Sequence, residues 1–439
     1  MSNRTVTHRQ VWQIAGPMII ANITTPLLGL VDTAMVGHLS AAHYLGAVAI
    51  GSMIFTFVFW GFGFLRMSTT GLTSQAHGEN APHKMQAILM QSIWLALLIA
   101  VLLLLFQVPI IRLALQLIDS SPEVKHYATI YFNIRIWSAP ATLINYAILG
   151  WLIGREASRA ALLMVLVINI INIVLDALLV LGFGMNVDGV ALASLIAEYG
   201  GLMVGILLLK HYGFSKNSVR LSLTKQTLRT SHRGLHVHGN VMIRTFLLIS
   251  CFALFTTQGA RQGDTVLAAN SVLLNFITFM AFVLDGFANA TEVLTGKSIG
   301  RRSPEMLKSS LNITVFWSVL TAASFSVVYL LFGENIIRAL TSIDAVINYA
   351  NHYLVWVIAA PLLAVWSYLL DGLFVGATRS REMRNTMLFS ALCCYLPAFY
   401  LLQVFGNHGL WAALMIFLAA RGLSQSLYVS QILRQADPQ

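Results

Sequence analysis

Carboxylates inside long apolar runs are the residues of this chain that could do chemistry. Asp32 lies in the first such run, where no Lys or Arg occurs from Val11 to Met35. An acid at membrane depth costs roughly 2.5–3.5 kcal/mol or more and usually faces a bundle interior or a wet cavity. Asp32 therefore indicates a site that binds a proton or a cation.

The run VLVINIINIVLDALLV contains the best candidate partners for Asp32. Its Asn169, Asn172 and Asp176 are spaced i, i+3 and i+7, so they share one helix face. Two amides and a carboxylate on one face must point into a bundle rather than at lipid. Two acids in one dry site favour the uptake of a proton near neutral pH. A purely structural polar clamp between helices remains the alternative.

Two prolines, Pro17 and Pro26, lie in the same run as Asp32. Each removes a backbone donor and crowds the preceding turn, so the helix should bend or loosen there. A bend near Asp32 would let protonation change the shape of the helix, and a static kink is the alternative.

A second group of charged residues falls in apolar runs of the other half of the chain. Asp285 and Glu292 are seven residues apart and share a helix face, while Arg244 can neutralise such acids or reach an interface. Asp371 fits a cap or salt bridge as well as a cargo role, and Glu198 is similarly ambiguous. Asp285, Glu292, Asp371 and Arg244 form a possible second-lobe or cargo site.

Composition determines the class of protein that carries these residues. Of 439 residues 57% are hydrophobic and 10% are charged, whereas soluble domains carry about 25% charged residues. Helices of about 20 apolar residues cross the ~30 Å hydrocarbon core. Twelve such spans are predicted: 11–35, 46–72, 86–109, 127–153, 160–183, 188–210, 239–258, 265–296, 309–332, 348–376, 386–404 and 408–432. The sequence predicts an all-α membrane protein.

The net charge is +10, and the positively charged residues are divided unequally between the two sides of the predicted spans. Most Lys and Arg residues fall on the side of the N-terminus, and the opposite side holds only Arg112, Lys125, Arg261 and Arg338. This asymmetry follows the positive-inside rule and predicts that both termini are cytoplasmic. No nucleic-acid partner is implied. The three cysteines all fall in predicted spans, with no metal spacing and no disulfide framework.

The chain repeats itself at an offset of 222 residues. Three patterns keep this register: Gly37 to Ala47 with Gly259 to Ala269, Thr73 to Gly78 with Thr295 to Gly300, and Tyr146 to Arg159 with Tyr368 to Arg381. We therefore predict two six-helix bundles, 1–210 and 239–439, joined by a cytoplasmic linker, 211–238. Bundles related by a pseudo-two-fold along the membrane normal suit alternating access about a central site.

The acids within the spans do not repeat. At the same offset, the positions equivalent to Asp32, Asp176, Glu198, Asp285, Glu292 and Asp371 are Leu254, Ala398, Ala420, Gly63, Thr70 and Leu149. Acids that served the bundle architecture alone should pair across the repeat. Their asymmetry favours a function for them, although later drift of a structural site explains it too.

Enzymatic motifs are absent from the sequence. It contains no Walker A sequence, nucleophile elbow, HExxH pair or Rossmann fingerprint. We expect no enzyme, no cofactor and no metal, so the energy must come from an ion gradient or a partner.

Four segments resemble a known family: TPLLGLVDTAMVGHLSAAHYLGAVAIG, FLRMSTTGLTSQAHG, LLDGLFVGATRSREMRN and NHGLWAALMIFLAARGLS. They are similar to the multidrug and toxic compound extrusion (MATE) family, in its DNA-damage-inducible, DinF-like branch. The resemblance implies twelve helices in two lobes that export diverse cationic or amphipathic compounds against inward proton or sodium flow. It also implies that Asp32 is the proton site, supported by Asn172, Asp176 and a hydroxyl at Ser194.

The expected coupling ion follows from a position at which this sequence departs from the family pattern. The sodium-coupled branch keeps an acid in helix seven, and span seven here has none. We therefore expect proton coupling in a monomer of a bacterial inner membrane, acting on small-molecule substrates. Three alternatives stay open: sodium coupling, a lipid-linked oligosaccharide flippase, which needs a cleft dense in Arg and Lys, and a non-transporting sensor.

Overall fold

The computed structural model describes residues 5–37, 42–118, 120–214 and 225–437, with the side chains of 25–37, 42 and 225–233 left out. Within these residues the chain is helical and has no strand. Contacts divide it into two compact units. We call Ile20–Thr73 with Ala81–Gly234 the N-unit, and Met1–Ile19, Ser74–Asn80 and Leu235–Gln439 the C-unit. The division departs from the predicted halves because the start of the first helix and residues 74–80 pack with the second half.

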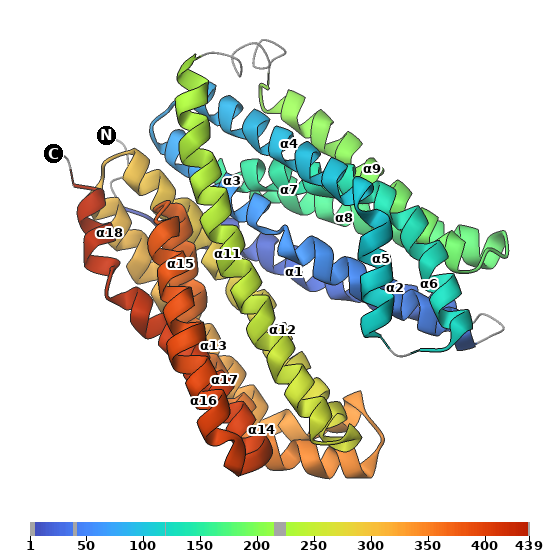
Figure 1. Cartoon of the computed structure of the whole chain (residues 1–439). Helices are drawn as coiled ribbons and strands as arrows, with labels where there is room; N and C mark the ends of the chain where they lie inside the picture. The colour runs from blue at the N-terminus through green and yellow to red at the C-terminus, as the bar shows by residue number, and fades with distance from the viewer. Residues whose placement is uncertain (1–4, 38–41, 119, 215–224, 438–439) are drawn as a thin grey trace. The chain divides into compact units, whose positions relative to one another are not determined.

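The N-unit is built from helices α1 to α9 (Figure 1). Their bounds are α1 His8–Gly37, α2 Ala42–Gly61, α3 Phe64–Gly78, α4 Pro82–Leu105, α5 Gln107–Leu117, α6 Pro122–Arg135, a 3-10 turn Ile136–Ser138, α7 Ala139–Gly154, α8 Ser158–Asp176, a π-helical turn Ala177–Gly182, and α9 Val187–His211. α1 and α3 are continuous helices that each contribute residues to both units.

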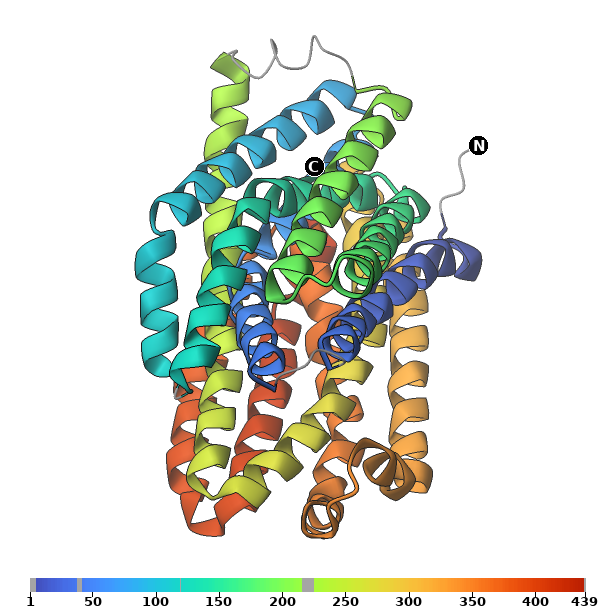
Figure 2. The same cartoon turned by 90° about the vertical axis from the view of Figure 1, so that its right-hand side faces the viewer.

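The C-unit holds α11 from Leu235 onward and α12 to α18 (Figure 2). Their bounds are α11 Lys225–Arg261, α12 Asp264–Gly300, α13 Pro304–Leu340, α14 Asp344–Gly376, α15 Ser380–Leu388, a π-helical turn Phe389–Tyr395, α16 Leu396–Leu401, a 3-10 turn Leu402–Phe405, α17 Gly406–Ser426 and α18 Val429–Gln435. α14 packs against α12, α13 and α17 and lies at the centre of this unit.

The helices account for the twelve predicted spans. Ten described stretches are long and apolar enough to cross a membrane. Nine of them match predicted spans two to ten, and the tenth, Ser380–Ser426, contains span eleven and most of span twelve. α1, 30 residues long, carries span one. Rows of exposed apolar side chains, such as Val327, Leu330 and Leu331 on α13, would be costly in water and face lipid.

The predicted linker is partly helical. α9 ends at His211 and α11 begins at Lys225, so residues 225–238 continue directly into span seven. Residues 215–224 lie outside the described part of the chain. α1 runs through Pro17 and Pro26 as one helix, and the boundary between the units falls two residues after Pro17. The predicted bend remains a prediction, and the side chain of Pro26 is not among those described.

Both ends of the chain lie at one end of the C-unit. The Val6 N–H donates to Ser309 Oγ at 3.1 Å, close to the start of α13, and α18 packs against α13 as well. The described ends of the chain therefore both lie near α13.

The internal repeat is preserved in the backbone. Among the described residues, four non-glycine positions have positive φ: Asn80 and Arg302, and Glu156 and Thr378. The members of each pair are 222 residues apart in the sequence and both follow the end of a helix. A β-branched residue such as Thr378 rarely adopts a positive φ. The helix arrangement that the two halves share therefore imposes this backbone conformation.

Two glycines at the repeat interval make equivalent contacts. A Cβ at Gly150 would collide with the backbone carbonyl of Arg66, and one at Gly372 with that of Ala288. Each glycine lets two helices touch through their backbones. The repeat predicted from sequence patterns is therefore also a repeat of helix contacts.

We expect Gly372→Leu to prevent folding, because the side chain would enter the space occupied by the Ala288 carbonyl. Gly239→Leu in α11 is the matched control, since nothing lies within 4 Å of its added Cβ. The yield of monodisperse protein after detergent extraction measures the effect. Equal yields for the two variants would show that the close contact at Gly372 is dispensable.

Candidate functional site

The polar face predicted on span five is buried in the N-unit. Asn172 and Asp176 are nearly inaccessible and Asn169 is also buried. The opposite face of the same helical segment exposes Ile170, Val174, Leu178 and Leu181, which face lipid. The side chains therefore point into the bundle, as their spacing predicted.

Asn172 and Ser194 are brought together by α8 and α9. The Asn172 Nδ2 donates to Ser194 Oγ at 3.2 Å. Immediately after Asp176 the helix widens into the π-helical turn Ala177–Gly182, a distortion that is frequent at functional sites. The contact between Asn172 and Ser194, implied by the resemblance alone, is present.

The Asp32 side chain falls outside the described residues. Its backbone belongs to α1, within the part of that helix assigned to the N-unit. Asp32 thus shares a compact unit with Asn172, Asp176 and Ser194, and its role as their partner remains a prediction.

Glu198, which the sequence left ambiguous, makes a specific contact. Asn145 Nδ2 on α7 donates to the Glu198 carboxylate at 2.9 Å and to its backbone carbonyl at 3.0 Å. Glu198 follows Ser194 by one helical turn on α9. That spacing is the signal that could have identified it from the sequence.

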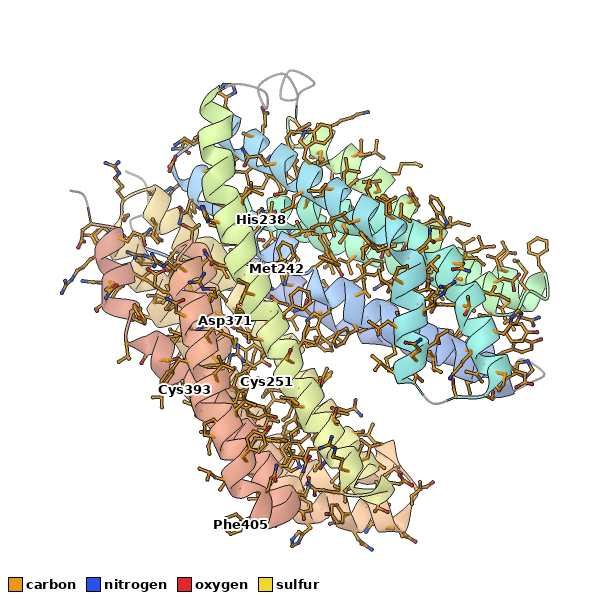
Figure 3. All side chains as sticks on the ribbon, in the orientation of Figure 1. His238, Met242, Cys251, Asp371, Cys393 and Phe405 are labelled. Atoms are coloured by element: carbon orange, nitrogen blue, oxygen red, sulfur yellow. The ribbon has the colours of Figure 1, made fainter. Side chains whose placement is uncertain are left out.

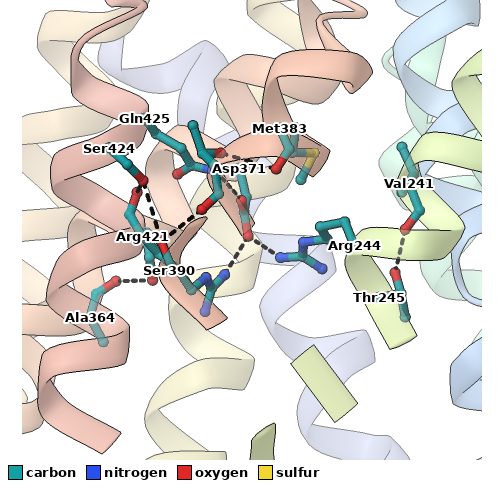
Figure 4. A network of polar contacts seen from close by, with 12 residues as sticks. Val241, Arg244, Thr245, Ala364, Asp371, Met383, Ser390, Arg421, Ser424 and Gln425 are labelled. Carbon is teal, nitrogen blue, oxygen red and sulfur yellow. Dashed lines mark hydrogen bonds and ion pairs between the residues drawn. The ribbon is translucent and has the colours of Figure 1, made fainter. Parts of the chain in front are cut away.

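The C-unit contains a buried charged network around Asp371 (Figure 4). One carboxylate oxygen accepts from Arg244 on α11 and from Arg421 on α17, the latter at 2.6 Å. The other accepts from Gln425 Nε2 at 2.6 Å. Figure 3 shows Asp371 inside this unit beside α11. The sequence predicted Arg244 and Asp371 as members but missed Arg421 and Gln425, which stand i, i+4 on α17.

This network is net basic, because two guanidinium groups meet one carboxylate. Both oxygens of Asp371 already accept hydrogen bonds, and the network connects α11, α14 and α17. We infer that Asp371 is chiefly an anchor for these helices.

The two remaining predicted acids lie on α12. Asp285 is half-buried, and its backbone carbonyl accepts from Asn289 Nδ2. Asp285 and Asp371 both lie within electrostatic reach of the half-buried Tyr368, so Asp285 lies in the surroundings of the network. Glu292 is buried two turns further on, where its backbone carbonyl packs against Gly376.

Metal and disulfide chemistry find no support in the described side chains. No group of three or more His, Cys, Asp or Glu residues among them is placed to hold a metal ion. Cys251, Cys393 and Cys394 are all free thiols.

Comparisons with known proteins agree with this architecture. The model of the MatE family matches residues 17–178 and again 241–401, once in each half. The chain is 44% identical to DNA damage-inducible protein F of Escherichia coli over 97% of this chain and 92% of that protein. It is 25% identical to the multidrug resistance protein NorM of Vibrio cholerae, over 97% and 95% of the two chains.

Solved structures share the fold. A MOP superfamily transporter from Pyrococcus furiosus superposes with a TM-score of 0.87 at 17% identity, covering 98% of this chain and 97% of that one. An outward-facing MATE family multidrug resistance transporter gives the same TM-score at 17% identity, over 99% and 98% of the two chains.

Proposed function

The chain belongs to the MatE family of membrane transporters, and on that premise we propose that it exports amphipathic or cationic small molecules in exchange for protons. It is a transporter and not an enzyme. The observation that carries the proposal is the buried polar set on α8 and α9, in which Asn172 donates to Ser194 beside the buried Asp176. Such a set inside a lipid-facing bundle is a typical ion-coupling site.

Proton coupling rather than sodium coupling is favoured by span seven. Residues 239–258 of α11 contain no acid, and the charged side chain they do contain is Arg244, which is bound to Asp371. In the proposed cycle, Asp32 takes up a proton from outside, α1 bends, and cargo leaves the N-unit. Deprotonation toward the cytoplasm resets the helix.

The proposed setting is a bacterial inner membrane with both termini in the cytoplasm. The two chain ends lie together at one end of the C-unit, and the Lys and Arg residues collect on that side of the predicted topology. The transporter is proposed to act as a monomer on small molecules, without a cofactor or nucleic acid.

Efflux from everted vesicles with an imposed pH gradient tests the proposal. We expect Asp32→Asn to abolish pH-driven efflux, because the amide cannot take up and release the coupled proton. Asp188→Asn is the matched control, since this acid stands at the start of α9, where it accepts from the Asn186 N–H. Unchanged efflux in Asp32→Asn would contradict the assigned coupling role, and efflux driven by sodium alone would contradict the choice of ion.

A further inference from the structure

Glu198 faces the interior of the N-unit but is not fully covered. The lipid face of α9 is marked by exposed Ile196, Tyr199, Met203 and Leu207. Glu198 lies on the opposite face, in line with the buried Ser194, Gly201 and Gly205. Its side chain is therefore directed into the bundle. A carboxylate midway along a membrane-spanning helix and on its interior face is a functional candidate.

The carboxylate of Glu198 is held in place by Asn145. That single amide group donates both to the side chain and to the backbone carbonyl of Glu198. Gly201 permits this approach, since a Cβ there would stand 3.3 Å from the same Asn145 nitrogen. Three residues on two helices thus fix the acid in one orientation.

A cation already occupies the surroundings of Glu198. Arg135 is on α6, which packs against α9, within electrostatic reach of Glu198, and it donates to the Tyr131 hydroxyl. Its guanidinium lies 5.2 Å from the centre of the Phe55 ring and 5.5 Å from that of Tyr131. Aromatic faces that already bind one cation can recognise another, and a carboxylate within electrostatic reach adds to that recognition.

The repeat shows that the bundle architecture does not require this cluster. At the 222-residue offset, Glu198, Asn145 and Arg135 correspond to Ala420, Ser367 and Val357. The C-unit has the equivalent helices without the carboxylate, the amide or the guanidinium group. The cluster is therefore particular to the N-unit.

We propose that Glu198 selects cargo for positive charge and that Arg135 is an internal cation which the cationic group of the cargo displaces. The inference rests on the proposed export function and adds a residue-level basis for charge selection. Displacement exchanges one cation for another, so that Glu198 and the Phe55 and Tyr131 rings keep a positive partner. It also predicts that removal of the internal cation strengthens cargo binding.

Two probes of nearly the same shape and opposite charge test this inference. Binding of tetraphenylphosphonium and of tetraphenylborate is measured by calorimetry on the purified full chain in nanodiscs. We expect Glu198→Gln to weaken phosphonium binding about tenfold or more and to leave borate binding unchanged or stronger. Arg135→Gln should strengthen phosphonium binding. Glu334→Gln, an exposed acid on α13, is the matched control.

The outcomes separate this inference from the proposed function. A purely structural role would make both Glu198→Gln and Arg135→Gln weaken both probes, which would overturn the inference. Equal phosphonium affinity in the native chain and in Glu198→Gln would also overturn it, even if Arg135→Gln could not be purified. Asp32→Asn, by contrast, should abolish pH-driven efflux of cargo of either charge, so loss of coupling and loss of charge selection are measured independently.

Discussion

Asp371→Ala is expected to lower the thermal midpoint of the purified protein strongly. Arg244 and Arg421 are both buried and both donate to one oxygen of Asp371. Removal of the acid would leave two uncompensated charges inside the bundle, a change that costs about 3–5 kcal/mol when a buried pair is broken. Loss of the tie between α11, α14 and α17 adds to this cost.

A charge-free version of the network should restore much of the stability. Buried ion pairs replaced by apolar residues of similar size are often neutral or stabilising. We therefore expect the triple variant Asp371→Leu, Arg244→Met, Arg421→Met to melt above Asp371→Ala. Glu334→Ala is the control, because its pair with Arg338 on α13 is exposed and should contribute about 0–1 kcal/mol. Similar midpoints for Asp371→Ala and Glu334→Ala would show that the network does not anchor the helices.

The fold was largely predictable because the bilayer imposes simple rules on sequence. Apolar length identified the spans, and residues held at a 222-residue interval predicted the repeat that reappears at Gly150 and Gly372. Backbone contacts through glycine can be recognised in the sequence, because any larger residue at these positions would collide with the neighbouring helix.

The partners of individual charged residues were harder to predict. The helical spacing of Asn172 and Asp176 fixed which face they occupy, and burial followed from it. No spacing rule connects Arg421 on α17 with Asp371 on α14, because that pairing depends on how the two helices cross. The two contact units divide inside the continuous helices α1, α3 and α11, and a continuous helix gives no sign in its sequence of which neighbours it packs against.

The ends of α3 and α12 meet through residues that the repeat makes equivalent. Ser74 lies against Gly296, Gly78 against the Lys297 carbonyl, and Gly300 against the Gln75 carbonyl. Ser74 and Gly296 are 222 residues apart in the sequence. The same interval separates Gly78 from Gly300 and Gln75 from Lys297. The contact is thus reciprocal between the two halves of the sequence, and it excludes any side chain larger than that of Ser74.

Oxidation of the double variant Ser74→Cys, Gly296→Cys is expected to stop pH-driven efflux almost completely. A Cβ built at Gly296 stands 2.8 Å from that of Ser74, slightly inside the roughly 3.5–4.5 Å of a disulfide, so a small shift of one helix closes the bond. Residues 74–80 belong to the C-unit by their contacts, whereas the rest of α3 belongs to the N-unit. Movement of one half of the chain against the other in alternating access should therefore act on this contact, and we expect the contact to open once in every cycle. A covalent bond at this point would hold it closed.

The measurement compares efflux before and after reduction in a background without Cys251, Cys393 and Cys394. Reduction should restore transport, and each single-cysteine variant should transport under both conditions, which separates the crosslink from the substitutions. A state that cannot form contributes nothing to the cycle, however tightly the other state binds cargo. Normal efflux from fully crosslinked protein would therefore mean that α3 and α12 remain in contact throughout transport and that the moving contact lies elsewhere in the chain.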